Sequence, residues 1–394
     1  MSSLESKLVG ELIAECELKA EPQETNDPYI RMFAVALGST VFKHPEVGEQ
    51  VSRVMLLKQR LNPFPASYAF NSLLRLYQMD NLDDPLYPYA NPSAWNRGVQ
   101  TWLEDPMSLD HTMTSMQIWN VGSDVETRIS GPKIIAQCWN PKIPEDTEGY
   151  KILSVGAARN HGLTMLASDM PIPNIAIDVE HAKKSSSYKK VEATINKLLQ
   201  QHIALGDCYG VDLYDLRNDI PWLRFLEACR FYPSELLDSE KRDRYRRLNV
   251  LRNEIEFIYH TTADFSDIEE PDDFNDWLKG IRTDDKNDMV LFSTSLYQNY
   301  PQKRRVMFNN ALARLKPDGI VVVLDFIEEN DCQNAEHILD SYDFTGPTGK
   351  PYTYKLYVYD SNEPDKKLQK CFDFKNGRCE EYIPSQLLLD KLAA

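Results

Sequence analysis

The chain has 394 residues, of which 42% are hydrophobic and 26% are charged, and its formal net charge is −16. This length allows two domains, or one large elaborated domain, with a sizeable core. An acidic chain repels phosphate backbones, so the composition disfavours nucleic acid as a partner. The sequence has no signal-peptide pattern and no apolar run of the roughly 18 residues that a membrane helix needs. Seven cysteines without a Cys-x-x-Cys pair predict reduced thiols, no metal site and a cytoplasmic protein.

The first 145 residues predict a mainly helical domain with some β structure. Apolar residues recur with helical spacing in three segments, residues 3–18, 29–36 and 67–77. Two later segments, residues 112–119 and 133–139, have the composition of strands. This region also holds four of the six tryptophans, Trp95, Trp102, Trp119 and Trp139. They form either a lid over an apolar acceptor or the core and an interface, and we favour the core.

Residues 140–149 (NPKIPEDTEG) predict a domain boundary, which we place between residues 145 and 146. Two prolines, a glycine and three acids interrupt the apolar pattern there. Beyond it, apolar runs of strand length alternate with helical patterns, which is typical of a parallel sheet covered by helices. The runs are residues 152–155, 174–179, 208–213, 255–259, 289–292 and 320–324.

Residues 288–326 form the most informative segment. A buried strand and a polar turn precede a helix that places Met307, Ala311 and Leu315 on one face. The turn Lys316-Pro317-Asp318-Gly319 ends this helix, and a second buried strand follows at once. The segment resembles the fourth strand, following helix and fifth strand of class I S-adenosylmethionine-dependent methyltransferases. Their habitual turn reads Leu-Lys/Arg-Pro-Gly-Gly, and Asp318 replaces one of its glycines.

Residues 150–162 (YKILSVGAARNHG) combine a strand with a glycine turn. Gly156 would let the backbone approach a ligand closely. The turn resembles the cofactor loop of the same family, Glu/Asp-x-Gly-x-Gly-x-Gly, with Ser154, Ala158 and Asn160 in place of the acid and of two glycines. The resemblance implies that Gly156, Ala158 and Asn160 hold the methionine part of S-adenosylmethionine. His161 would contact the methionine carboxylate or act as a base.

The family also places an acid at the end of its second strand, where it accepts hydrogen bonds from the ribose hydroxyls. Asp178 lies 178 − 156 = 22 positions beyond Gly156, the spacing that the resemblance favours. Asp212 has the more characteristic local sequence, Gly-Val-Asp-Leu after a strand, and we favour it. The chain offers three strand candidates between the glycine loop and residue 289, where a minimal fold has two. One of them is therefore an insertion or an extra strand.

The resemblance implies further site residues after the next two strands. Asp264 would bind the adenine amino group, with Asp267 as the neighbour that could replace it. Ser293 and Thr294 follow the fourth strand, where cofactor and substrate meet, and Tyr297 would orient the substrate. Near the end of the chain, Asn376-Gly377 predicts a hairpin with a type I′ turn, which would place Cys379 opposite Phe374.

These patterns predict an α/β fold: a Rossmann-like methyltransferase sheet with a C-terminal antiparallel hairpin over residues 146–394, plus the mainly helical domain over residues 1–145. The predicted function is S-adenosylmethionine-dependent methyl transfer to a small-molecule or protein acceptor. Ser-Thr-Ser-Leu after the fourth strand disfavours the enzymes that methylate amino groups of DNA bases or protein glutamine. The alternatives are a non-catalytic binding or assembly module with this fold, which the changes at Ser154, Ala158 and Asn160 motivate, and a dinucleotide-dependent oxidoreductase.

Overall fold

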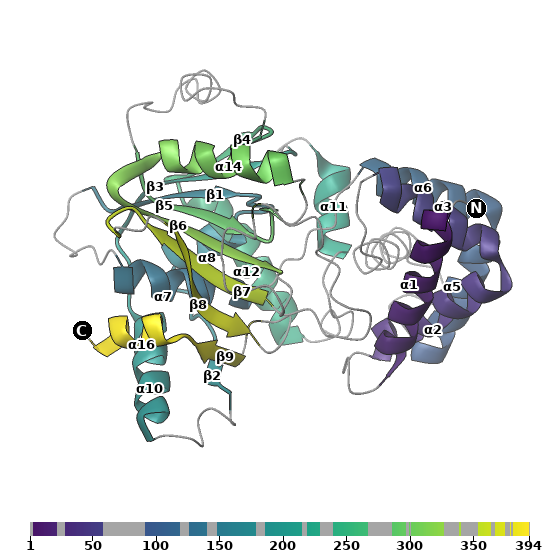
Figure 1. Cartoon of the computed structure of the whole chain (residues 1–394), viewed down its shortest axis with the longest axis horizontal. Coiled ribbons are helices and arrows are strands. Elements are labelled where there is room, and N and C mark those ends of the chain that lie inside the picture. The colour runs from purple at the N-terminus through teal and green to yellow at the C-terminus, as the bar shows by residue number, and fades with distance from the viewer. Residues whose placement is uncertain are drawn as a thin grey trace. The chain divides into compact units, whose positions relative to one another are not determined.

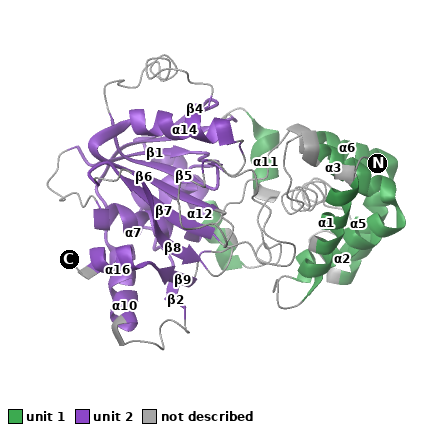
Figure 2. Ribbon diagram, viewed as in Figure 1, with its two compact units in different colours: residues 1–124, 219–246, 345–351 green, residues 125–218, 247–344, 352–394 purple. Residues whose placement is uncertain are grey.

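The chain divides into two compact units in the computed structural model (Figures 1 and 2). One unit, here the helical unit, comprises residues 1–124, 219–246 and 345–351, and the other, the sheet unit, comprises residues 125–218, 247–344 and 352–394. The structure describes residues 3–21, 28–57, 91–118, 126–139, 148–178, 186–214, 219–228, 239–266, 286–296, 299, 301–326, 339, 354–363, 367–374, 379 and 381–393. No helix within these ranges is long and apolar enough to cross a membrane.

The helical unit is built from amphipathic helices around one hydrophobic core. Its described helices are α1 (Ser3–Ala20), α2 (Pro28–Lys43), α3 (Pro45–Leu57), α5 (Pro92–Glu104), α6 (Pro106–Ile118), α11 (Ile220–Ala228) and the first half of α12 (Ser239–Glu254). The predicted helices at residues 3–18 and 29–36 are confirmed, and residues 67–77 lie outside the described ranges. Trp95 is 1% exposed in the core of this unit, so for this tryptophan the core interpretation is confirmed.

The strand predicted at residues 112–119 is wrong, because residues 106–118 form helix α6. Leu109 and Met113 lie four residues apart, and both side chains are buried in the core of the helical unit. Burial at this spacing stabilises a helix. The threonines and the isoleucine of the segment, which suggested a strand, carry less weight than this packing.

The sheet unit contains a nine-stranded sheet in the order β2-β9-β8-β7-β6-β5-β1-β3-β4. Its strands are β1 (Tyr150–Val155), β2 (Ala176–Ile177), β3 (Leu205–Asp212), β4 (Ile258–Thr262), β5 (Asn287–Ser293), β6 (Leu315–Phe326), β7 (Tyr354–Asp360), β8 (Leu368–Phe374) and β9 (Glu381–Pro384). The strands β4, β3, β1, β5 and β6 are parallel to one another, and β6 to β9 continue as an antiparallel meander. This order confirms the predicted Rossmann-like sheet with an antiparallel C-terminal hairpin.

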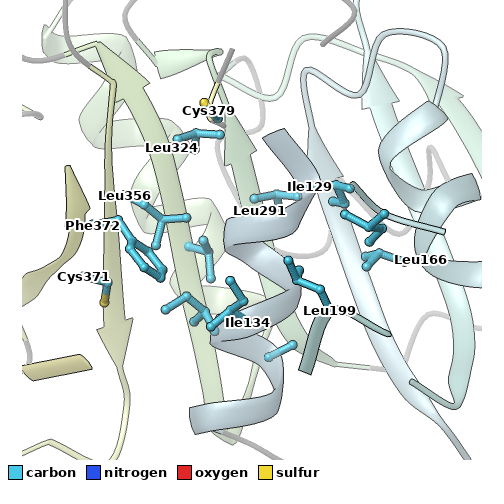
Figure 3. Close-up of a cluster of buried hydrophobic side chains, with 14 of the residues drawn as sticks. Ile129, Ile134, Leu166, Leu199, Leu291, Leu324, Leu356, Cys371, Phe372 and Cys379 are labelled. Atoms are coloured by element: carbon cyan, nitrogen blue, oxygen red, sulfur yellow. The ribbon is translucent and has the colours of Figure 1, made fainter. Parts of the chain in front are cut away.

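Helices cover both faces of this sheet, which buries its central strands completely. The helices are α7 (Ser130–Trp139), α8 (His161–Ala167), α10 (Ser186–Gln200), α14 (Pro301–Ala313) and α16 (Gln386–Ala393), and a 3₁₀ turn, η1 (Glu126–Ile129), precedes α7. Alternate residues of β6 enter different cores: Val322 packs with α7, α8 and α10, whereas Val323 packs with α14. Figure 3 shows the first of these cores, with Ile134 of α7 near the strands that carry Leu291 and Leu356.

The strand predicted at residues 133–139 is also wrong, because this segment is helix α7. Ile134 and Ile135 are fully buried in the core of the sheet unit, so a short apolar run that fits a strand forms a helix lying on the sheet. Since η1 and α7 belong to the sheet unit, the two units divide at residues 124/125 in this part of the chain. The boundary predicted at 145/146 falls after these elements.

Most predicted strands correspond to observed ones, with differences at their ends. Residues 152–155, 208–213, 289–292 and 320–324 overlap β1, β3, β5 and β6. The run at 255–259 begins too early, because a turn follows the end of α12 at Glu254 and β4 starts only at Ile258. The predicted turn at residues 316–319 lies in a bulge of β6, which pairs Leu315 with Asn287 and Ile320 with Met289. The predicted type I′ register is wrong, since Phe374 pairs with Tyr382 rather than with Cys379.

Candidate functional site

The order of the parallel strands reverses between β1 and β5. From β1 the chain builds the sheet outward through β3 and β4, and then returns to place β5 and β6 on the other side of β1. In open α/β sheets, ligands bind outside the carboxyl ends of the strands at such a switch point. Three of the segments that the sequence singled out follow the carboxyl ends of β1, β3 and β5, so the structure brings them to this switch point.

The turn after β1 fits tightly against the segment after β5. Gly156 has a φ of +70°, and its N–H donates to the carbonyl of Val211 at the end of β3 (2.8 Å). A Cβ atom at position 156 would lie 2.6 Å from the Cβ of Ser295. Only glycine therefore fits here, for both conformation and space. The contact joins the two sides of the switch point.

Two non-glycine residues complete this turn in conformations that favour glycine. Ala158 has a φ of 46° and Asn160 a φ of 59°, which is the left-handed region that L-residues adopt at a cost. The turn thus has left-handed residues at the two positions where the family has glycines. The Asn160 side chain is buried against β3, where a Cβ atom at Gly210 would lie 1.8 Å from its Oδ1. Gly210 therefore makes room for the Asn160 amide. The sequence did not predict this role of Gly210.

Asp212 ends β3 directly beside this turn. Its Oδ2 accepts a hydrogen bond from the Ala158 N–H (2.8 Å), and its Oδ1 accepts one from the Leu213 N–H (2.8 Å). Burial raises the pKa of the Asp212 carboxyl to about 6, although the backbone N–H groups of Ala158, Leu213 and Tyr214 act in the opposite direction. Each carboxylate oxygen has a further lone pair, so the group can still accept hydrogen bonds from a ligand.

Asp178, the alternative to Asp212, lies at an edge of the sheet, far from β1. It follows β2, the outermost strand beyond β9, and its backbone N–H donates to the Tyr382 carbonyl (3.0 Å). Five strands separate β2 from β1 in the strand order. Of the two acids, only Asp212 lies beside the turn after β1. The extra strand that the sequence predicted before residue 289 is β2.

Asp264 follows β4, where its carboxylate is held by two neighbours. Its Oδ1 accepts hydrogen bonds from the Ser266 N–H (2.9 Å) and hydroxyl (2.6 Å), and its Oδ2 forms an ion pair with Lys303 of α14 (3.1 Å). Burial acts to raise the pKa of Asp264, but the hydrogen bonds from Ser266 and the Lys303 ammonium together lower it. The carboxylate is therefore ionised at neutral pH. Asp267 lies outside the described residues.

Of the two residues proposed from the sequence as catalytic, the structure describes only His161. His161 begins α8, and its buried ring bonds through Nε2 with the Asn249 Oδ1 of α12 (3.1 Å). This bond orients the imidazole towards α12, and the role of His161 as a cofactor contact or a base stays a prediction. Tyr297 lies outside the described residues, and its role stays a prediction.

The segment after β5 contains the predicted residues Ser293 and Thr294, and two further residues, Ser295 and Arg304 of α14, were missed by the sequence prediction. Ser293 ends the strand half-buried, and Thr294 has a φ of 57° with its N–H donating to the Leu324 carbonyl (2.7 Å). Ser295 lies against Gly156, as described above. Arg304 of α14 is 3% exposed and donates through Nε to carbonyls of this segment. The sequence does contain a signal for the burial of Arg304, because this residue shares one face of a helix with positions 307, 308 and 311.

No protein-family model and no curated protein sequence matches this chain. Among solved structures, the plantazolicin methyltransferase BpumL in complex with SAH is 11% identical, with 57% of this chain and 56% of that chain covered and a TM-score of 0.25. An O-methyltransferase family protein from Burkholderia thailandensis is 8% identical, with 68% and 59% covered and a TM-score of 0.25. SAM-bound CalS10, an amino pentose methyltransferase from Micromonospora echinaspora, is 11% identical, with 64% and 75% covered and a TM-score of 0.26.

The chain thus spans little more than half the length of the first two of these proteins. TM-scores of this size describe a weak likeness. We therefore base the function on the strand order and on the side chains at the switch point.

Proposed function

We propose that this chain is an S-adenosylmethionine-dependent methyltransferase that acts on a small-molecule or protein acceptor. The observation that carries the proposal is the pairing of Asp212 with the turn after β1 at the switch point of the sheet. A glycine turn lets the ligand approach the backbone, and a carboxylate on the next strand accepts hydrogen bonds from the hydroxyls of a ribose. The residues fit an adenosyl ligand because both features adjoin the same peptide, Ala158.

The proposed roles of the described residues follow from their positions, whereas the role of Tyr297 follows from the sequence alone. Residues 156–160 would hold the methionine part of the cofactor, Asp212 the ribose, and Asp264 the adenine amino group. Ser293 and Thr294 would adjoin the reacting methyl group, with Tyr297 orienting the acceptor. When bound, the cofactor supplies a methyl group that its sulfonium already activates. The contribution of the protein is then to align the acceptor with that group.

A second candidate is a binding or assembly module that keeps the fold without catalysis. Ala158 and Asn160 favour it, because they carry side chains at positions where the family has glycine. The two candidates differ in one outcome. A module would bind the cofactor weakly or without turnover, whereas an enzyme would transfer a labelled methyl group from S-adenosylmethionine to an acceptor.

The first test is isothermal titration of the protein with S-adenosylhomocysteine, the product of methyl transfer. We expect micromolar binding, and Asp212→Asn should weaken it about tenfold or more because the amide is a poorer partner for two hydroxyls. Asp178→Asn is the control, since β2 lies at the far edge of the sheet, and it should bind like the wild type once its melting curve shows a folded protein. The absence of heat at millimolar ligand would refute the proposal. Tighter binding of NAD would favour the oxidoreductase.

A further inference from the structure

The segment after β5 contains a strained backbone. Thr294 is β-branched and has a φ of 57°, a conformation that is a genuine outlier for such a residue. A strained residue persists only where its surroundings determine the conformation, and such residues gather at functional sites. The neighbours that hold Thr294 in place therefore indicate what shapes the switch point.

Arg304 is a buried side chain that bonds to the backbone shortly after Thr294. Its Nε–H is shared between the Leu296 carbonyl (3.0 Å) and the Asn299 carbonyl (2.7 Å), so one guanidinium bonds to both residues. The Asn299 side chain continues this network, since its Nδ2 donates to the Ser295 carbonyl (2.9 Å) and its backbone N–H donates to the Leu296 carbonyl (2.9 Å). The network ends at Ser295, the residue that touches Gly156.

The charge of Arg304 is compensated inside the protein. Burial lowers the pKa of the guanidinium to about 10, and the carboxylate of Asp325 at the end of β6 acts in the opposite direction. Asp325 is fully buried. The group thus stays protonated at neutral pH, and a buried charge of this kind is retained where its hydrogen bonds are needed.

We propose that Arg304 is a positioning residue of the site at the switch point. It holds the segment after β5 in the form that sets Ser295 against Gly156, and so fixes the position of this segment relative to the turn after β1. The inference rests on the proposed function for its effect on the cofactor. Arg304 acts through Leu296, Asn299 and Ser295, not by touching the ligand.

The test compares Arg304→Lys with Arg305→Lys, a matched change at the exposed neighbouring position. A lysine ammonium keeps the charge but not the planar geometry that serves two carbonyls. In the ligand-free full-length chain, hydrogen exchange of peptides covering residues 294–299 should become faster in Arg304→Lys, while peptides from β1 and β3 keep their protection. The affinity for S-adenosylhomocysteine should fall about tenfold with little change in melting temperature. Arg305→Lys should match the wild type in all three measurements.

The outcomes separate the two proposals. Wild-type protein that binds no S-adenosylhomocysteine would overturn the proposed function, whatever the exchange rates. If the wild type binds it and Arg304→Lys binds it equally well, or if exchange at residues 294–299 does not change, the role of Arg304 is overturned. Should Arg304→Lys not fold, Asn299→Ala removes the bond to the Ser295 carbonyl and leaves the buried charge in place. It should show the same faster exchange and weaker binding, and wild-type values would overturn the inference.

Discussion

The Asp212 carboxyl has a raised pKa, and it lies where its ionised form would accept hydrogen bonds from the ribose of the cofactor. Burial raises its pKa to about 6 from an ordinary value of 3.8. Between these two values the folded protein binds a proton that the unfolded chain releases. The contribution of this group to stability therefore falls as the pH rises from about 4 to about 6, and it is constant above that range. A ligand that bonds to the carboxylate favours the opposite, ionised form.

We expect the affinity for S-adenosylhomocysteine to fall as the pH is lowered through about 6, approaching a tenfold loss per pH unit below that value. The reason is that a protonated Asp212 accepts hydrogen bonds from two hydroxyls poorly. Titrations at pH 6 in buffers of different ionisation enthalpy should show that binding releases a fraction of a proton. In Asp212→Asn the residual affinity should not depend on pH in this range. A wild-type affinity that is constant from pH 5 to pH 8 would contradict this role.

Replacing Ala158 by glycine should stabilise the protein, because the Ala158 φ of 46° lies in the left-handed region. Ala158→Gly removes about 1–2 kcal/mol of conformational strain from the folded state, whereas the greater freedom of glycine in the unfolded chain costs about 0.5–1 kcal/mol of stability. We therefore expect a net gain of up to about 1.5 kcal/mol in the free energy of unfolding. Ala157→Gly is the control, since Ala157 does not have a positive φ, and it should lose about 0.5–1 kcal/mol. Urea unfolding measures both, and the same sign for both variants would be contrary to expectation.

How much of the site the sequence could predict depends on how local each residue's role is. Gly156 and Asp212 were found because a strand followed by a glycine or an acid is a local pattern. The contact of Gly156 with Ser295 joins positions 295 − 156 = 139 residues apart, and no local pattern encodes it. Gly210 and Arg304 were missed for the same reason, since the amide that covers Gly210 and the carbonyls that bind Arg304 come from other elements.

At the scale of elements, the sequence predicted where strands form better than it predicted which strands pair with one another in the sheet. Residues 174–179 read as a strand, and β2 forms there, but it pairs with β9 at the edge of the sheet rather than with a parallel strand near β1. The apolar period defines a strand, whereas its place in the sheet depends on long-range pairing. The same limit explains α7, whose short apolar run fits a strand as well as a buried helix.

The edge strand β2 depends on side chains of α10 for its hydrogen bonds. Asn196 accepts from the Ile175 N–H (2.9 Å) and donates to the Ile175 carbonyl (3.0 Å), and Glu192 accepts from the Ile177 N–H (2.8 Å). Asn196→Ala should therefore cost about 1–3 kcal/mol in urea unfolding, because both backbone groups lose their partner. Thr194→Ala, on the exposed face of α10, should change stability by less than about 0.5 kcal/mol. Equal effects of the two changes would show that β2 does not need this bond.

At the scale of the whole molecule, the helical unit is not a continuous stretch of sequence. Residues 219–246 leave the sheet unit between β3 and β4 and belong to the helical unit. Phe225 of α11 is fully buried in the same core as Leu8, Leu37 and Trp95. Sequence reasoning placed a single boundary near residue 145, because composition shows where a linker lies but not that a later segment completes an earlier core.

A chain that begins at residue 125 should therefore not behave as an intact domain. It would keep Phe225 and Trp222, which are 0% and 2% exposed in the full chain, but would lose the N-terminal helices whose side chains share a core with Phe225. We expect residues 125–394 to bind a hydrophobic dye more strongly than the full-length protein. Phe225→Ser in the shortened chain should reduce that binding, because it removes part of the exposed apolar surface. A shortened chain that melts cooperatively and binds no more dye than the full-length protein would show that α11 does not need this core.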